Sequence, residues 1–363
     1  MKTNMGHKDS KSQVYFMKVN SPELGVRVES LKKLLQATEN HFNFSRQEIV
    51  PVKITIGDSA CVYNIHPELV KVVVSLIKEK GAKPFLFDTS VIYHGERQNA
   101  VDHLNLAQSK GFGHNRVGAP FVIADGLLGQ DGREITIDAA QIKKIKTPSF
   151  VGMLDSLVVL SHATGHIVSG FAAALKNVAM GMSCRPSKQV QHSSLKPSVM
   201  EKKCTACGLC IANCPVKAIA FKNNKANIDR SLCIGCGECL CFCKFDAIFI
   251  NWEEEADIFV ERMAEVAGGI VAQFKNKFFI TFALDVTKEC DCISGKNELI
   301  ASRDIGILAS TDPLALDKAT AFLVKEFATG DHWKRNEKVY EHMFTYAASI
   351  GVGSLDYQVR DIS

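Results

Sequence analysis

Eight of the thirteen cysteines in this chain occur in two runs with one spacing, Cys-x2-Cys-x2-Cys-x3-Cys. Bacterial-type proteins with two [4Fe–4S] clusters use such runs, and the fourth cysteine of each run ligates the other cluster. Thiolate sulfur is a soft ligand that suits iron–sulfur clusters. We therefore predict one cluster at Cys204, Cys207, Cys210 and Cys243, and a second at Cys233, Cys236, Cys239 and Cys214.

Zinc sites and disulfides are the alternatives for these cysteines. A zinc site usually combines two Cys-x2–4-Cys halves separated by a loop, whereas this chain repeats a run of four. Disulfides require an oxidising compartment. The repeat therefore favours clusters, although Lys244 stands where the first run has Pro215 after its last cysteine. Cys241 lies between two predicted ligands and is assigned no ligand role.

A second group of reactive side chains lies between residues 161 and 192, among small residues. It comprises His162, His166, Lys176 and His192. Neutral imidazole is a frequent metal ligand, and a partly buried lysine tends to have a lowered pKa or an anionic partner. A structural role explains each residue taken alone, but the set favours a ligand site. Gly165 and Gly170 predict a loop around the two upstream histidines.

Cys290 and Cys292 form a third cysteine feature. In an extended segment, residues two apart share a face, so both thiols can point into one cleft. Two interpretations stay open, a metal or redox pair and passive thiols in a reducing cell. The isolated Cys61 and Cys184 are expected to be structural.

An α/β fold must position these groups, and the apolar pattern predicts one on both sides of the cysteine repeat. The expected helices are 67–80, 100–110 and 256–274, and the expected strands are 83–88, 120–124, 156–160, 278–284 and 305–309. Another helix is expected to start at Pro313, with Thr311 or Asp312 as its N-cap. Open α/β sheets bind ligands beyond the carboxyl ends of their strands. Asp88 and Asp285, which follow two such strands, are therefore candidate cofactor-binding residues.

Residues 1–195 and 251–363 are expected to form one α/β body with a parallel-type sheet. A small α+β, ferredoxin-like domain at residues 196–250 interrupts that body. The alternative is three separate domains in a row. Residues 185–198 are polar, contain two prolines and are interpreted as a connecting segment.

The composition, 363 residues of which 46% are hydrophobic, allows two or three globular domains. The net charge of +4 is small and gives no reason to expect nucleic-acid binding. The longest apolar runs have strand length, far below a membrane span, and the first residues lack the apolar stretch of a signal peptide. We expect a cytoplasmic protein of an anaerobic cell, because exposed [4Fe–4S] clusters are sensitive to oxygen.

The whole chain resembles the iron–sulfur branch of a large family defined as a domain of unknown function. The resemblance is carried by the cysteine repeat, His192, Asp88-Thr89, Tyr93-His94-Gly95-Glu96-Arg97, Ser161-His162, Gly165-His166, Gly170-Phe171, Lys176-Asn177, Met180-Gly181, residues 285–288 and 290–292, and Asp312-Pro313-x-Ala315-x-Asp317. It implies no particular reaction. The chain departs from the family pattern at Ala163-Thr164, where members often have an aromatic residue and a lysine, and at Ala172-Ala173, where glycines are usual.

A more distant resemblance, to the lactate racemase N-terminal family, covers only residues 166–192. The shared pattern is His166-x3-Gly170-Phe171-x4-Lys176-x15-His192. It implies a nickel-pincer nucleotide bound covalently through Lys176, a nickel ligand at His192 and a role for His166 in forming the site. It also implies that His94, near Arg97, belongs to a catalytic base element.

Three functions fit these features. The first is an electron-transfer oxidoreductase, in which two [4Fe–4S] clusters exchange electrons with a ferredoxin-type redox partner and with a nucleotide-type or metal ligand in the α/β body. Its catalytic candidates are Lys176, His162, His166 and His94, and its cofactor-binding candidates are Lys176, His192, Asp88 and Asp285. The second is a non-redox, racemase-like or cofactor-binding enzyme with structural clusters. The third is a ferredoxin-like adaptor of a larger redox complex, which the departure at Ala163-Thr164 favours. The small-molecule substrate is not identified by the sequence.

Overall fold

The computed structural model of this chain describes residues 11–93, 95–192, 196–214, 216–233, 239, 242–245, 247–250, 256–292, 298–300, 304–329 and 336–363. Four residues named above, His94, Pro215, Cys236 and Cys241, lie outside these ranges. Among the described helices, none is both long and apolar enough to cross a membrane.

The described residues form a nine-stranded central sheet in the order β15-β1-β14-β13-β7-β2-β3-β4, with β8 paired to β7. Neighbours from β13 through β4 run parallel, whereas β14 is antiparallel to β1 and β13. The bounds are β1 Ser12–Lys18, β2 Ile49–Lys53, β3 Lys83–Asp88, β4 Phe121–Ile123, β7 Ser156–His166, β8 Gly170–Ala172, β13 Asn276–Thr287, β14 Gly306–Ser310 and β15 Tyr357–Asp361. This mostly parallel sheet confirms the predicted α/β fold.

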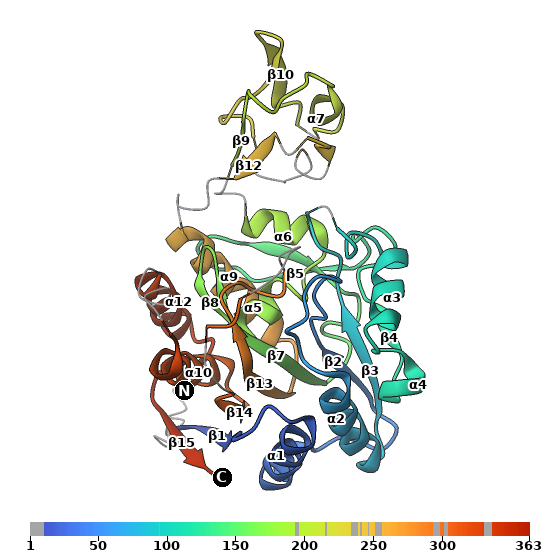
Figure 1. Cartoon of the computed structure of the whole chain (residues 1–363), viewed down its shortest axis with the longest axis vertical. Coiled ribbons are helices and arrows are strands. Elements are labelled where there is room, and N and C mark those ends of the chain that lie inside the picture. The colour runs from blue at the N-terminus through green and yellow to red at the C-terminus, as the bar shows by residue number, and fades with distance from the viewer. Residues whose placement is uncertain are drawn as a thin grey trace, which may run out of the picture.

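Strands from both sides of residues 196–250 are neighbours in this sheet. β7 and β13 pair in parallel from Ser156 opposite Asn276 to His162 opposite Phe282, after which the register shifts. Figure 1 shows the two strands side by side in the middle of the body. The segment that follows β13 therefore reaches the same edge of the sheet as the histidines of β7.

Helices cover both faces of the sheet, because alternate strand residues point to opposite sides. Val158 and Leu160 pack with α1 and α2 in one core, whereas Leu157 and Val159 pack with α5, α9, α10 and α12 in another. The helices are α1 Leu24–Ala37, the 3-10 turn η1 Glu39–His41, α2 Pro67–Glu79, α3 Ala100–Ser109, α4 His114–Val117, α5 Ala174–Ala179, α6 Arg185–Gln191, α9 Ala256–Val271, α10 Pro313–Phe327 and α12 Glu337–Ser349. A separate hairpin joins β5 Arg133–Thr136 to β6 Lys144–Thr147.

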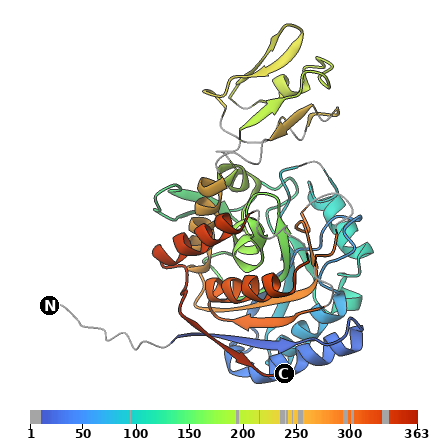
Figure 2. The same ribbon diagram turned by 60° about the vertical axis from the view of Figure 1, so that its left-hand side comes forward.

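The cysteine-rich residues form small sheets of their own. β9 Pro197–Val199 pairs with β12 Ile248–Ile250, and β10 Ile219–Lys222 pairs with β11 Lys225–Ile228. The short helix α7 Leu209–Ala212 carries Cys210. In Figures 1 and 2 these elements lie beyond α6, away from the central sheet.

Two local expectations were wrong. The expected loop at His162 and His166 is the end of β7, which pairs with β8 from Thr164 opposite Ala172 to His166 opposite Gly170. Gly165 does not loosen this strand: a Cβ there would lie 2.0 Å from the carbonyl oxygen of Lys288, so its small size permits a close backbone approach. The expected connecting segment contains α6, because Pro186 stands in the first turn, where its missing N–H costs nothing.

The helix that carries Lys176 is capped by a distant carboxylate. Ala173, the N-cap residue of α5, has no side chain able to accept a hydrogen bond. Asp317 of α10 supplies the acceptors instead, since its Oδ1 and Oδ2 each accept a backbone N–H, from Ala174 and Leu175, at 2.8 Å. Asp317 is fully buried, so these N–H groups have no access to water as a substitute. α10 therefore fixes the start of α5.

Replacing Asp317 by alanine leaves two buried N–H donors without their acceptors. We expect the free energy of unfolding to fall by about 3 kcal/mol, because each unsatisfied buried donor costs about 1–3 kcal/mol. Asp317→Asn, which keeps one acceptor oxygen, should lose less. Anaerobic urea unfolding of the three proteins measures the difference, and an Asp317→Ala midpoint equal to that of the wild type would contradict the capping role.

Candidate functional site

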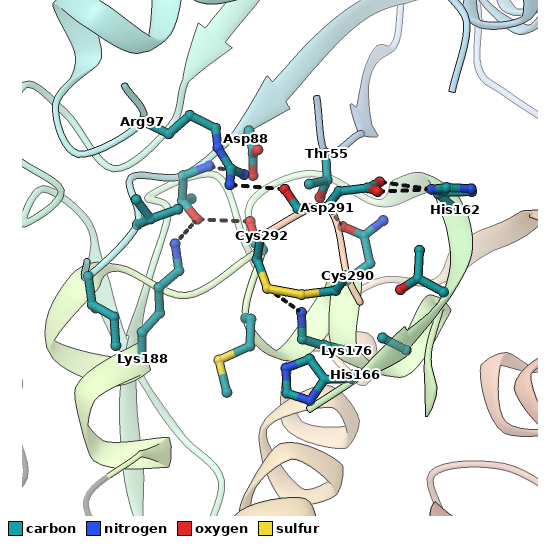
Figure 3. A pocket seen from close by; sticks show the side chains of 18 of the residues that line it. Thr55, Asp88, Arg97, His162, His166, Lys176, Lys188, Cys290, Asp291 and Cys292 are labelled. Atoms are coloured by element: carbon teal, nitrogen blue, oxygen red, sulfur yellow. Dashed lines mark hydrogen bonds and ion pairs between the residues drawn. A yellow bond between two sulfur atoms is a disulfide. The ribbon is translucent and has the colours of Figure 1, made fainter. Parts of the chain in front are cut away.

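A pocket of about 480 Å³ opens at the carboxyl ends of the parallel strands. Its walls come from the segment after β3, the end of β7, α5, α6 and the segment after β13. Figure 3 shows Lys176, His166, Cys290 and Cys292 gathered at one side and Asp88 with Arg97 at the other. The size is that of a small-molecule site.

Five of the residues predicted from the sequence line this pocket: Asp88, His162, His166, Lys176 and His192. Asp285 does not line it. The register shift between Phe282 and Thr287 leaves Asp285 with a positive φ of 46°, and its carboxylate pairs with Arg27 at 2.7 Å. A bulge of this kind redirects a side chain, so Asp285 faces Arg27 and not this pocket, and its cofactor-binding role stays a prediction. His94 lies outside the described residues.

A buried ion pair lies behind one wall of the pocket, which Asp88 and Asn177 line. Lys53, at the end of β2, is fully buried, and its Nζ lies 3.0 Å from Asp88 Oδ1 and 2.8 Å from Asn177 Oδ1. Burial lowers the pKa of Lys53, and the charge of Asp88 opposes that shift. Burial disfavours the ionised form of Asp88, but the positive charges around it, of which Lys53 contributes most, together outweigh burial and lower the pKa of Asp88. Asp88 is therefore a structural partner of Lys53 as well as a pocket residue.

Arg97 ties the loop after β3 to the segment after β13. Its Nε donates to Asp58 Oδ1 at 2.6 Å, and its terminal nitrogen donates to the Tyr93 hydroxyl at 3.0 Å and to the Asp291 carbonyl at 3.2 Å. The guanidinium is buried, and such charges are stable only when they are paired and hydrogen-bonded. Arg97 thus holds the Asp291 backbone in place.

His162 also binds the segment after β13, at the side chain of Asp291. Its Nδ1 lies 3.0 Å from Asp291 Oδ1, and its Nε2 lies 2.8 Å from the Leu284 carbonyl oxygen. Burial favours neutral imidazole, but the Asp291 carboxylate and the Leu284 carbonyl together outweigh burial, so the pKa of His162 is raised. With both ring nitrogens facing acceptors, His162 holds Asp291 and is not placed as a proton acceptor.

Two lysines project into the pocket with lowered pKa values. Burial lowers the pKa of Lys176 to about 8, although Asp291 opposes the shift. Its Nζ lies 3.6 Å from Cys292 Sγ. Burial also lowers the pKa of Lys188 to about 8, and this ammonium donates to Thr89 Oγ1 at 2.7 Å and to the Ser90 carbonyl oxygen.

His166 and His192 flank the ring of Phe259, with centroid distances of 6.2 Å and 4.8 Å. Burial lowers the pKa of His192 to about 3 and holds the pKa of His166 well below its ordinary value, so both are neutral. His166 Nδ1 accepts backbone N–H groups from Val168 at 3.2 Å and Ser169 at 3.0 Å. The ring hydrogen of His166 is therefore on Nε2.

Cys290 and Cys292 are joined by a disulfide that lines the pocket. A ring nitrogen of His166 and the two sulfur atoms lie within 4.8 Å of one another. By distance alone, this group can hold a metal ion. Both sulfur atoms point into one cleft, as expected from their spacing, and in this structure they are bonded to each other.

In the cysteine-rich unit, the described residues between 196 and 250, a small hollow is lined by four cysteines, Cys204, Cys207, Cys210 and Cys243. These are the four residues predicted for one cluster. Backbone N–H groups point at the sulfur atoms: Ala226 donates to Cys204 at 3.4 Å and Ala247 donates to Cys243 at 3.3 Å. The Ala226 hydrogen bond lowers the pKa of Cys204. Of the other predicted set, Cys214 accepts the Ala218 N–H at 3.2 Å, and Cys236 lies outside the described residues.

Sequence reasoning missed Lys53, Lys188 and the role of Asp291. Lys53 carried a usable signal, because it ends the apolar strand Ile49–Lys53, where a charge is unusual without a buried partner. Lys188 carried none, since a lysine in a polar helix is ordinarily exposed. Asp291 lies between the two cysteines, and nothing in the local sequence indicates that it binds His162 and Arg97.

The pKa of Lys176 can be tested by competitive acetylation. With a pKa of about 8, half of Lys176 is neutral and nucleophilic at pH 8, whereas an ordinary lysine is less than about 1% neutral there. Trace acetic anhydride at pH 6–11, followed by peptide mass spectrometry, should show acetylation of Lys176 rising with a midpoint near pH 8. Titration of Lys176 together with the exposed lysines near pH 10 would contradict the assigned environment.

No curated protein matches this chain. A lactate racemase apoprotein from Thermoanaerobacterium thermosaccharolyticum has 12% identity and a TM-score of 0.38 over 76% of this chain and 51% of the racemase. A protein from Thermotoga maritima has 11% identity and a TM-score of 0.37 over 88% of this chain and 59% of the other. The chain thus spans between half and three fifths of the length of these two structures.

The sequence also matches one described family, and the match begins in β2 and ends in α10. It covers residues 50–322, which include the strands that form the pocket and the cysteine-rich unit. Most of the chain is therefore accounted for by a single match, and the protein belongs to the family described as Domain of unknown function (DUF362).

Proposed function

We propose that this protein is an iron–sulfur electron-transfer protein, an oxidoreductase whose residues 196–250 hold two [4Fe–4S] clusters and whose α/β body holds a small-molecule ligand. The observation that carries the proposal is the hollow lined by Cys204, Cys207, Cys210 and Cys243. Residues distant in the sequence meet there in the combination that the spacing predicts for one cluster.

The donor set suits an iron–sulfur cluster. Four thiols supply the soft ligands, and the N–H groups of Ala226, Ala218 and Ala247 point at Cys204, Cys214 and Cys243 at 3.2–3.4 Å. Hydrogen bonds to the ligating sulfur atoms are one of the means by which proteins set cluster potentials. A cluster bound there supplies one-electron transfer. The chain's own part is to hold the thiolates and shield them with Phe221, Phe245 and Ile248.

The pocket of the α/β body is the proposed ligand site. Lys176 and Lys188 place two ammonium groups in a cavity with Met180 and other apolar groups on its walls. Such a cavity favours a small anionic molecule, because a partly desolvated cation gains from an opposite charge. A nucleotide phosphate is one ligand of this chemistry, and a ferredoxin-type protein is the proposed redox partner of the clusters.

A non-redox, racemase-like enzyme is the second candidate. The observation in its favour is that His166, Lys176 and His192 line one pocket, as the sequence pattern requires. In that function the clusters would be structural. Reducing the clusters with dithionite distinguishes the two candidates. If the clusters exchange electrons with the ligand site, reduction should chemically change the ligand that is released from the pocket. If the clusters are structural, the released ligand should be unchanged.

The anaerobically purified protein should contain about eight iron atoms and about eight acid-labile sulfides per chain. Cys204→Ala should damage one cluster, leaving at most a [3Fe–4S] form there, while the second cluster survives because its ligands are different. Iron and sulfide assays with electron paramagnetic resonance measure both effects. Cys61→Ser is the matched control, since Cys61 is buried in the α/β body. Stoichiometric zinc with no iron–sulfur signal in the wild type would rule out the proposal.

A further inference from the structure

The disulfide between Cys290 and Cys292 lies in surroundings that favour a reactive role over a stabilising one. It lines the pocket of the α/β body, and Cys290 is only 4% exposed. A disulfide between residues two apart closes a very short loop, so loop-closure entropy gives it little stabilising role. Its position in a pocket beside a lysine calls for a different explanation.

Two polar side chains lie close to the sulfur atoms. Lys176 Nζ is 3.6 Å from Cys292 Sγ, and a ring nitrogen of His166 is within 4.8 Å of both sulfurs. Figure 3 shows Lys176 and His166 on the same side of the disulfide. A cation beside a sulfur atom stabilises the thiolate that forms when the S–S bond breaks.

Which ring nitrogen of His166 carries the hydrogen determines whether this histidine can ligate a metal ion. Nδ1 already accepts two backbone N–H groups, from Val168 and Ser169, and Nε2 carries the ring hydrogen. A metal at Nε2 would displace that hydrogen to Nδ1, where it would meet the two N–H donors. Because neither nitrogen offers a lone pair to a metal without this conflict, His166 is better placed as a hydrogen-bond donor than as a ligand.

We propose that Cys290 and Cys292 form a reversible two-electron redox centre that exchanges with a small dithiol in the pocket. Cys292 is the sulfur that leaves as the thiolate, and Lys176 is its catalytic cation. The assignment goes beyond the proposed electron-transfer function, because this exchange involves neither [4Fe–4S] cluster.

The exchange balances without another reactant. One thiolate of the dithiol attacks Cys290 Sγ, the S–S bond breaks, and its electron pair leaves with Cys292 beside Lys176. The second thiolate of the dithiol then attacks the substrate sulfur bound to Cys290 and releases Cys290 as a thiolate. The dithiol ends as a cyclic disulfide, and its two protons pass to the two cysteines. The reverse sequence oxidises the cysteine pair.

One tryptic peptide reports this chemistry. Cleavage after Lys288 and Lys296 gives residues 289–296, which contain Cys290, Cys292 and no other cysteine. The native full chain, with its clusters, is incubated anaerobically with dithiothreitol, quenched with excess iodoacetamide, and digested. The peptide should change from the disulfide form to the doubly alkylated form, and addition of oxidised dithiothreitol before the quench should reverse the change.

Substitutions of Lys176 test whether its charge speeds reduction of the disulfide, beyond the access that dithiothreitol has to the pocket. Lys176→Met should slow native reduction of the peptide about tenfold, because a neighbouring cation lowers a leaving-group pKa by at least about one unit. Lys176→Arg keeps the charge and should restore most of the rate. Lys110→Met is the matched control and should leave the rate unchanged, since Lys110 is a half-buried lysine whose Nζ binds the carbonyls of Asp58 and Cys61.

Three results would overturn the proposal. One is a disulfide that dithiothreitol reduces only after denaturation. Another is equal rates for the wild type and a Lys176→Met protein with a native circular dichroism spectrum. The third is purification of the pair as thiolates with one bound metal ion that is lost in Cys290→Ser, which would establish a metal site instead. Iron and sulfide contents are measured in parallel, so failure of this proposal is distinguishable from failure of the cluster assignment.

Discussion

The buried ion pair between Lys53 and Asp88 is the interaction on which the pocket depends. Its atoms lie 3.0 Å apart in the interior, and Lys53 Nζ also binds Asn177 Oδ1 at 2.8 Å, so β2, β3 and α5 are held together at one point. Removing one partner of a buried pair typically costs about 3–5 kcal/mol, because the other charge is left without compensation. Gly181 is part of this arrangement, since a Cβ there would lie 2.3 Å from Lys53 Cε. The backbone must approach closely for the pair to form.

The pocket is assembled from segments on both sides of the cysteine-rich unit. β7 and α5 precede residues 196–250, whereas β13, with Cys290 and Cys292 beyond it, follows them. Parallel pairing of β7 with β13 brings the two cysteines to His166 and Lys176. Asp317, also from the later segment, caps the helix that carries Lys176. The body therefore cannot complete its pocket until the chain on both sides has folded together.

The two groups of cysteines occupy different chemical environments. In the cysteine-rich unit, several sulfur atoms face backbone N–H groups, and the proposed clusters there transfer single electrons. In the α/β body, the Cys290–Cys292 disulfide faces an ammonium and an imidazole, an arrangement that suits transfer of an electron pair. Buried partners keep Asp291, between the two cysteines, in place: His162 binds its carboxylate and Arg97 its carbonyl. This rigidity favours a fixed sulfur geometry over a mobile loop.

Local pattern was enough to predict several of the elements and one of the two sets of cysteines. The helix Pro67–Glu79 and the strand Lys83–Asp88 follow from apolar spacing, and the N-cap role of Asp312 follows from Pro313, because these signals act within a few residues. The combination of Cys243 with the first three cysteines also follows from spacing, and it is the set that lines one hollow. Which charged side chains pair with one another was decided only by the tertiary structure. Lys53 binds a residue 124 positions away, Asp317 caps one 143 positions away, and a bulge diverts Asp285 to Arg27. Such partners are fixed by strand order and register, which depend on the whole sheet and not on any short stretch of sequence.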